Sequence, residues 1–289
     1  MNTTQITALM FSSILSVLIF WIFKEMGRRK EKALPVIVIN YVVCMVLGNI
    51  VLGETHLLKS GTLTKEGVWP IFFLGFLFMV TFLFMAESTR ESGASLSAVA
   101  SKMSMVIPVS SALFFFDEEI SAELLIGISL ALLSVGLITY QSENKGGFSW
   151  LLIAVFVGSG GVDLSMNLIK HQHYSGWSNL QFTTLTFFGA TVAGLLYTLW
   201  KWLNHGFEIK ILPSTLFFGV LLGGINLFSI YAIYHALDVF ESSSSVFFTV
   251  NNVLVVMGSV TVGLVYKEGF NTRKIIGLIA AVFALILLG

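Results

Sequence analysis

Ten long apolar runs, separated by short polar breaks, limit what this chain can fold into. A helix needs about 20 predominantly apolar residues to cross a membrane, and most of the runs approach or exceed that length. They are continuous, whereas the strands of a membrane barrel are short and alternate. The runs are Ile6–Phe23, Leu34–Leu52, Val68–Met85, Ala94–Phe116, Leu124–Tyr140, Trp150–Ile169, Leu180–Trp202, Leu216–Ala236, Val246–Tyr266 and Ile275–Leu288. We therefore predict an all-α integral membrane protein with ten transmembrane helices.

The composition agrees with lipid as the solvent of this chain. Hydrophobic residues make up 56% of the 289 residues and charged residues only 11%, against about 25% charged in a soluble domain. The net charge is zero, which gives no indication of a nucleic acid partner. The single cysteine, Cys44, forms no internal disulfide and no metal set. The expected partners are the lipid bilayer and a small-molecule substrate, with no metal and no cofactor.

Lys and Arg are unevenly divided between the connections that join the runs. Twelve lie in the odd-numbered connections, three in the even-numbered ones, and one inside a run. The cluster Gly27–Lys32 dominates this count. Positively charged loops stay in the cytoplasm. We therefore predict a protein of a bacterial-type inner (plasma) membrane with both termini outside.

The two halves of the chain resemble each other after a shift of 150 residues. The matching pairs are Ala86 and Ala236, Glu91 and Glu241, Ser92 and Ser242, Ser95 and Ser245, Glu118 and Glu268, Ile126 and Ile276, and Gly127 and Gly277. The polar matches recur at the same points between runs, as an internal repeat requires. Because each unit has an odd number of spans, the second copy enters the membrane upside down. We predict an inverted repeat of two five-helix units, residues 1–141 and 149–289.

Several of these residues carry a resemblance to a known family. They are the run Ala94–Ala100 with Pro108, then Glu118 and Gly127, and in the second half Ser242–Ser245, Glu268 and Gly277. In this pattern the chain resembles the ten-helix (EamA-like) branch of the drug/metabolite transporter superfamily. The resemblance implies export or import of small polar metabolites, amino acids or drugs by alternating access. Two features depart from it: many relatives are thought to keep both termini in the cytoplasm, and Asp117–Glu119 replaces the usual basic residues.

Two charged side chains lie well inside the expected spans. Lys102 is about nine residues into the fourth span, and Asp163 is about fourteen residues into the sixth. Such a charge costs on the order of 2.5–3.5 kcal/mol at the bilayer centre on insertion scales. The two side chains therefore face a polar cavity, pair with each other, or do both. A substrate-binding role and a structural role remain open for each.

Polar residues recur at the same depth in the second half of the chain. Asn252 is the repeat counterpart of Lys102, and Asn251 that of Ser101. An asparagine in a membrane helix either lines a site or bonds one helix to another. The resemblance adds aromatic residues to the walls of the cavity, for which ordinary packing is the alternative. The candidate substrate-binding residues are Lys102, Asp163, Asn251, Asn252, Tyr231, Tyr234 and Phe82.

Two short motifs near Asp163 have a structural and a functional interpretation. Gly158–Gly161 precedes Asp163 by two residues and favours either close helix packing or a hinge. His171 and His173 are expected just beyond the sixth span, where they either bind a metal or sense pH, or remain solvated loop residues.

Three classes of function are compatible with a polytopic membrane protein. An enzyme is disfavoured: Ser159 between two glycines could act as a nucleophile only with a base at hydrogen-bond range, the histidines are expected at helix ends or in loops, and no metal motif is present. A receptor or scaffold without transport would leave the repeat and the buried charges unexplained. We predict a transporter of a small polar metabolite, and a zwitterion such as an amino acid would use both Lys102 and Asp163.

Asp163 also suggests how transport is energised. It resembles the membrane carboxylate in the first helix of small multidrug resistance proteins. A carboxyl group in poorly hydrated surroundings has its charged form disfavoured, so it can exchange a proton. We therefore predict proton coupling through Asp163.

Overall fold

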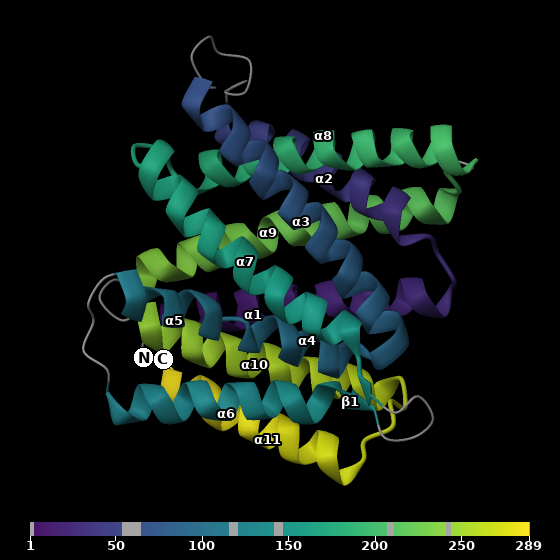
Figure 1. Cartoon of the computed structure of the whole chain (residues 1–289). Coiled ribbons are helices and arrows are strands. Elements are labelled where there is room, and N and C mark those ends of the chain that lie inside the picture. Colours follow the sequence, from purple (N-terminus) through teal and green to yellow (C-terminus); the bar gives the residue numbers. More distant parts are fainter. Residues whose placement is uncertain are drawn as a thin grey trace.

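The computed structural model describes residues 3–53, 65–115, 121–141, 147–206, 211–240 and 244–288, which form a bundle of helices (Figure 1). The helices are α1 (Thr3–Arg28), α2 (Ala33–Leu52), α3 (Lys65–Ser92), α4 (Ala94–Met103), α5 (Val106–Phe115), α6 (Ala122–Thr139), α7 (Trp150–His173), α8 (Asn179–His205), α9 (Pro213–Phe240), α10 (Ser244–Val265) and α11 (Thr272–Leu288). Two short strands, β1 (Tyr140–Gln141) and β2 (Gly147–Phe148), pair antiparallel between α6 and α7.

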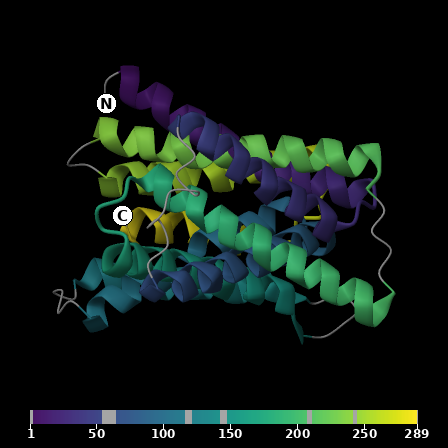
Figure 2. The same ribbon diagram turned by 90° about the horizontal axis from the view of Figure 1, so that it is seen from above.

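The predicted helical membrane fold is confirmed. Eight of the described helices are long and apolar enough to cross a membrane, namely α1, α2, α3, α6, α7, α8, α9 and α10. The two remaining predicted spans fall on α4 with α5, which follow each other directly, and on α11, which has 17 residues. Both ends of the chain lie at the same end of the bundle (Figures 1 and 2), as an even number of traverses requires.

The fourth predicted span differs from the prediction. A continuous helix was expected over Ala94–Phe116, but the structure breaks it at Ser104 and Met105, between α4 and α5; Phe116 lies outside the described residues. Pro108 has no N–H to bond the Ser104 carbonyl four residues earlier. The amide of Ile107 bonds that carbonyl instead, at 2.9 Å, which tightens the turn. Proline therefore ends one half-helix and begins the next.

Helices of the first half pack mainly on helices of the second half. The helix α1 contacts α9 and α10, and α7 contacts α3 and α4; α2 lies against α8 and α9, and α3 lies against α7 and α8. The last helices of the two halves, α6 and α11, pack on each other and form a pair at the bottom of Figure 1. The two halves are therefore interlocked along their length.

The crossing of α3 and α8 shows why small residues are needed where these helices meet. A Cβ on Gly189 would lie 2.7 Å from the Ile71 carbonyl oxygen, and one on Gly75 would overlap the backbone of α8. Next to this crossing, the buried Tyr41 ring stacks on Phe187 at 5.9 Å, and its hydroxyl donates to the Phe78 carbonyl at 2.9 Å. Small residues allow the backbones to approach, and aromatic rings fill the space beside them.

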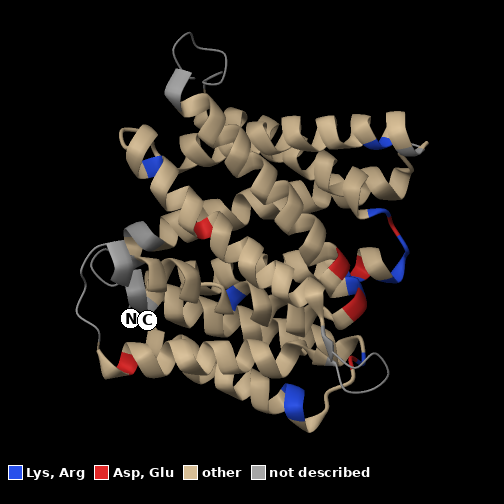
Figure 3. Ribbon diagram, in the orientation of Figure 1, with Lys and Arg blue, Asp and Glu red and all other residues tan. Residues whose placement is uncertain are grey.

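The surface of the bundle is apolar, as a lipid-facing surface must be. Large hydrophobic side chains are exposed along α1, α2, α6, α8 and α11. Trp69, Trp150, Trp200 and Trp202 are also exposed near helix ends, where amphipathic rings settle at the lipid–water interface. Figure 3 shows most charged residues at the ends of the bundle and only isolated ones between them.

Candidate functional site

The break between α4 and α5 places Lys102 in the last turn of a half-helix. Free carbonyl groups at a helix C-terminus favour a nearby cation, so this position suits a lysine. The break packs closely against α7, because a Cβ on Gly160 would lie 2.8 Å from the Ser104 carbonyl oxygen. The Lys102 side chain is partly exposed. Many transporters hold their substrate at a broken helix.

Asp163 faces Lys102 from α7. The two charges are close enough to interact electrostatically. No ion pair within 4.0 Å joins them, and within the described ranges neither charged group has a hydrogen-bond partner. The Asp163 side chain is exposed although it lies in the middle of its helix. The structure therefore places the two predicted charges near each other, but they do not form an ion pair.

Tyr234 of α9 belongs to the same region. Its hydroxyl group interacts electrostatically with Asp163 and forms a hydrogen bond with the Thr183 hydroxyl at 3.2 Å. Tyr231, one turn earlier, is 46% exposed. Phe82 lies on α3, where its ring contacts those of Phe23 and Tyr41 at 5.8 and 5.7 Å. Of the three predicted aromatic residues, Tyr234 is thus the one that interacts electrostatically with Asp163.

The two predicted asparagines of α10 have different surroundings. Asn251 is buried, and its side-chain oxygen accepts hydrogen bonds from Ser12 at 3.1 Å and Ser13 at 2.9 Å. Asn251 therefore connects α1 to α10. The Asn252 amide points to the sulfur of Met105 at 3.8 Å, next to the break between α4 and α5. Asn252 is thus the asparagine that reaches the half-helix end.

Sequence reasoning missed several polar residues of this region. Ser159 donates a hydrogen bond to Ser101 at 3.1 Å and so joins α7 to α4. Thr183 bonds Tyr234, and Ser16 bonds Ser229 at 3.0 Å. A hydroxyl in an apolar run carries no pattern of its own, so only its spatial neighbours reveal it.

The glycines before Asp163 favour the packing interpretation. A Cβ on Gly158 would lie 2.7 Å from the Thr81 hydroxyl oxygen, and Gly160 touches the α4–α5 break. Gly161 faces open space.

The positions of His171 and His173 differ from the prediction. Because α7 extends to His173, His171 and His173 lie in its last turn and not beyond the helix. Within the part of the chain that is described, no three His, Cys, Asp or Glu side chains are grouped as a metal site would require.

Two buried hydrogen bonds join helix α2 of the first half to helix α9 of the second half. Asn226 of α9 donates to Asn40 of α2 at 3.2 Å, and Cys44 donates to the Gly223 carbonyl at 3.2 Å. These buried contacts bond helices together.

Glu118, Glu241 and Ser242, which the repeat pairs with other residues, lie outside the described residues.

The geometry agrees with comparisons to known proteins. Residues 5–140 match the sequence model of the EamA-like transporter family. A Haemophilus influenzae protein, described as uncharacterized, is 26% identical over 223 residues, covering 75% of this chain and 74% of that protein. A crystal structure with 10% sequence identity superposes with a TM-score of 0.57, covering 97% of this chain and 96% of its own, which shows a common fold. Over residues 5–140, the chain is therefore similar to the EamA-like transporter family.

Proposed function

We propose that this protein is a membrane transporter that carries a small polar metabolite by alternating access, with amino acids as the class that fits best. One observation carries the proposal: Lys102 is partly exposed at the end of a half-helix, and no described side chain pairs with its ammonium group. A lysine in a membrane interior is costly unless a polar partner compensates its charge. A substrate anion would supply the direct hydrogen-bond partner that no described side chain supplies.

The facing charges suggest which substrate fits. Lys102 offers three hydrogen-bond donors to a carboxylate, and Asp163 offers acceptors to an ammonium group. Their mutual attraction without an ion pair leaves both groups available to a ligand. The Tyr234 hydroxyl, which interacts with Asp163, and the Asn252 amide, next to the α4–α5 break, offer further polar groups to a ligand. A zwitterion such as an amino acid would satisfy both charges at once.

The packing of the helices supports the proposed inverted repeat. Residues 1–141 and 149–289 are the two units. In the repeat register α1 corresponds to α7, α3 to α9, and α4 to the first part of α10. The contacts of α1 with α9 and α10 then correspond to those of α7 with α3 and α4. Two such units can rock against each other around a fixed central site, which is the motion that alternating access needs.

Proton coupling is part of the proposal. An empty site holds Lys102 and Asp163 under mutual attraction. Binding of a substrate carboxylate at Lys102 weakens that attraction, which favours the charged form of Asp163, so Asp163 can take up a proton. Its remaining carbonyl oxygen still accepts a hydrogen bond from the substrate ammonium group. Release of substrate and proton on the other side restores the empty state. In the proposed orientation both termini lie outside a bacterial-type plasma membrane, because most Lys and Arg lie in the odd-numbered connections.

A ligand-stabilisation screen tests the proposal on purified protein. Each common amino acid, and the corresponding amines and carboxylic acids without the second charge, is added singly and the melting temperature is measured. A ligand at 100 times its Kd stabilises the folded state by about 2.7 kcal/mol. We expect stabilisation by one or a few amino acids, and none by them in Lys102→Ala.

The matched control is Lys170→Ala, which removes a lysine that bonds Asn179 at the end of α7. This variant should keep the ligand-dependent shift. Stabilisation that is equal in wild type and Lys102→Ala would remove Lys102 from the site. Stabilisation by singly charged amines alone would move the substrate class from zwitterions to cations.

A further inference from the structure

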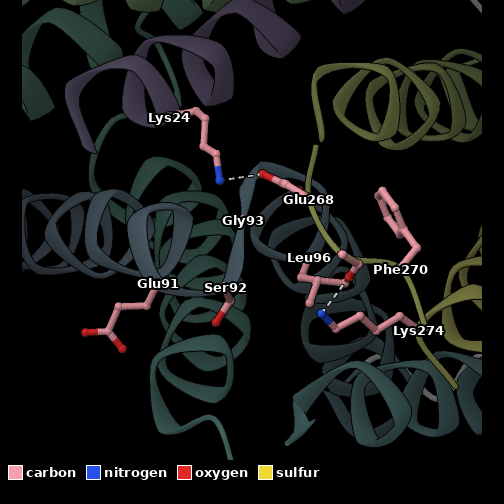
Figure 4. A pocket seen from close by; sticks show the side chains of 9 residues that line it. Lys24, Glu91, Ser92, Gly93, Leu96, Glu268, Phe270 and Lys274 are labelled. Carbon is pink, nitrogen blue, oxygen red and sulfur yellow. Dashed lines mark hydrogen bonds and ion pairs between the residues drawn. The ribbon is translucent and has the colours of Figure 1, made fainter. Parts of the chain in front are cut away.

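The carboxylate of Glu268 joins three helices at one end of the bundle. This end, where Lys24, Arg28, Arg90 and Lys274 lie, is called the basic end below. Glu268 follows α10, and its Oε1 lies 2.8 Å from Lys24 Nζ on α1 (Figure 4). The Glu268 side chain is only 9% exposed. The ion pair therefore connects the first-half helix α1 to the second-half helix α10 at a shielded position.

The same carboxylate caps α4. It accepts hydrogen bonds from the Ala94 amide at 2.7 Å, the Ser95 amide at 3.4 Å and the Ser95 hydroxyl at 2.8 Å. The residue before α4, Gly93, has no side chain that could cap the helix. A negative charge is stabilised at a helix N-terminus by the free N–H groups there. Glu268 supplies this cap from the other half of the chain.

Two glycines make room for this carboxylate. A Cβ on Gly93 would lie 2.5 Å from Glu268 Cδ, and Gly93 also has a φ of 103°, which L side chains rarely adopt. A Cβ on Gly263 of α10 would overlap the Ser95 hydroxyl and lie 2.6 Å from Glu268 Oε2. The Glu268 carboxylate can thus occupy this position only because neither residue has a side chain.

A second contact links the end of α1 to Tyr266, which follows α10 directly. The buried Glu25 carboxylate accepts a hydrogen bond from the Tyr266 hydroxyl at 2.9 Å, and Arg28 and Arg29 hold it from its own helix. Ser95 additionally donates to the Ser259 carbonyl of α10 at 3.3 Å. The ends of α1, α4 and α10 are therefore tied together at the basic end. A pocket of about 200 Å³ lies at these contacts, and Lys24, Gly93 and Glu268 are among the residues that line it (Figure 4).

We propose that Glu268 is the latch of a gate at the basic end, which holds that end closed by capping α4 and pairing with Lys24 at once. The inference rests on the proposed alternating access, because a substrate can leave at the basic end only if α1, α4 and α10 separate there. One carboxylate serves both contacts, so its withdrawal releases α4 and α1 together. The loss of this carboxylate therefore removes the α4 cap and the Lys24 ion pair in one step, whereas the Glu25–Tyr266 and Ser95–Ser259 contacts break separately.

Thiol labelling tests the latch without any substrate. The reporter is Ser259→Cys in a Cys44→Ala background, because Ser259 is fully buried between α10 and α4. The labelling rate is measured with a water-soluble maleimide on purified protein. We expect Glu268→Gln to raise it about tenfold, as the loss of one charge-assisted hydrogen bond implies. Gly263→Ala, which adds a methyl group against the Glu268 carboxylate, should also raise the labelling rate.

Two control variants should leave the labelling rate unchanged. Glu87→Gln removes the carboxylate of a half-exposed pair with Arg90, and Gly136→Ala adds a methyl group where no atom lies within 4 Å. If Glu268→Gln is not monodisperse, Lys24→Met is measured in its place. An unchanged rate in the latch variants, or an equal rise in the controls, would overturn the latch. Transport measurements do not enter this test, so its failure is distinct from a failure of the proposed function.

Discussion

Lys102 on α4 and Asp163 on α7 attract each other electrostatically without forming an ion pair within 4.0 Å. A charged pair in contact would form a closed structural unit and would leave nothing for a ligand. A pair held apart keeps a donor and an acceptor available in the middle of the bundle. This separation is the structural basis for proposing a substrate site and a proton site next to each other.

Asp163→Asn tests the proton site. The amide keeps the size of the side chain but cannot exchange a proton, so accumulation driven by a pH gradient should be lost in proteoliposomes. Downhill exchange of the same substrate should remain measurable. The control is Glu123→Gln, which changes an exposed carboxylate in the first turn of α6. Accumulation by the Asn variant that still follows the pH gradient would contradict proton coupling through Asp163.

A cysteine at the α1–α2 connection tests the orientation. Arg29→Cys in a Cys44→Ala background places a thiol at a position where the side chain is 56% exposed. If the basic end is cytoplasmic, an impermeant thiol reagent should not label it in intact cells. Gly176→Cys, in the exposed α7–α8 connection at the other end of the bundle (Figure 1), should label readily. The reverse pattern would invert the topology.

Gly189→Val tests the close approach of α3 and α8. A side chain there would be forced against the Ile71 carbonyl, at 2.7 Å for Cβ alone. Overpacking of this kind costs about 1–3 kcal/mol, so the melting temperature of the purified protein should fall. The matched substitution Gly136→Val adds the same side chain where open space is available and should have a much smaller effect. Equal melting temperatures for the two variants would show that this crossing does not limit stability.

The helices were predictable from the sequence because an apolar run of spanning length has few other uses. The α4–α5 break was missed although Pro108 was visible, because proline in a membrane helix is often tolerated. Nothing in the apolar pattern distinguishes a kinked helix from a broken one. The contact of Gly160 with the Ser104 carbonyl, which is a tertiary feature, accompanies the break.

The site was predictable only where charge made it conspicuous. Lys102 and Asp163 stood out because a charge in an apolar run is costly, and the structure places them in electrostatic range. Ser159 and Thr183 gave no such signal, since hydroxyl groups are common in membrane helices. Asn251 could not be assigned from sequence, because its bonds to Ser12 and Ser13 depend on how α1 packs against α10.

The most direct test of the account is uptake by proteoliposomes of an amino acid that stabilises the purified protein. Wild-type protein should accumulate or exchange the labelled compound, and Lys102→Ala should lose about tenfold to a hundredfold in rate, the loss expected for hydrogen bonds to a charged group. Lys102→Ala should remain folded and monodisperse, and Lys170→Ala should transport as wild type does. Normal transport by Lys102→Ala would contradict the proposed site, and binding without any flux in wild type would contradict transport itself and favour a receptor.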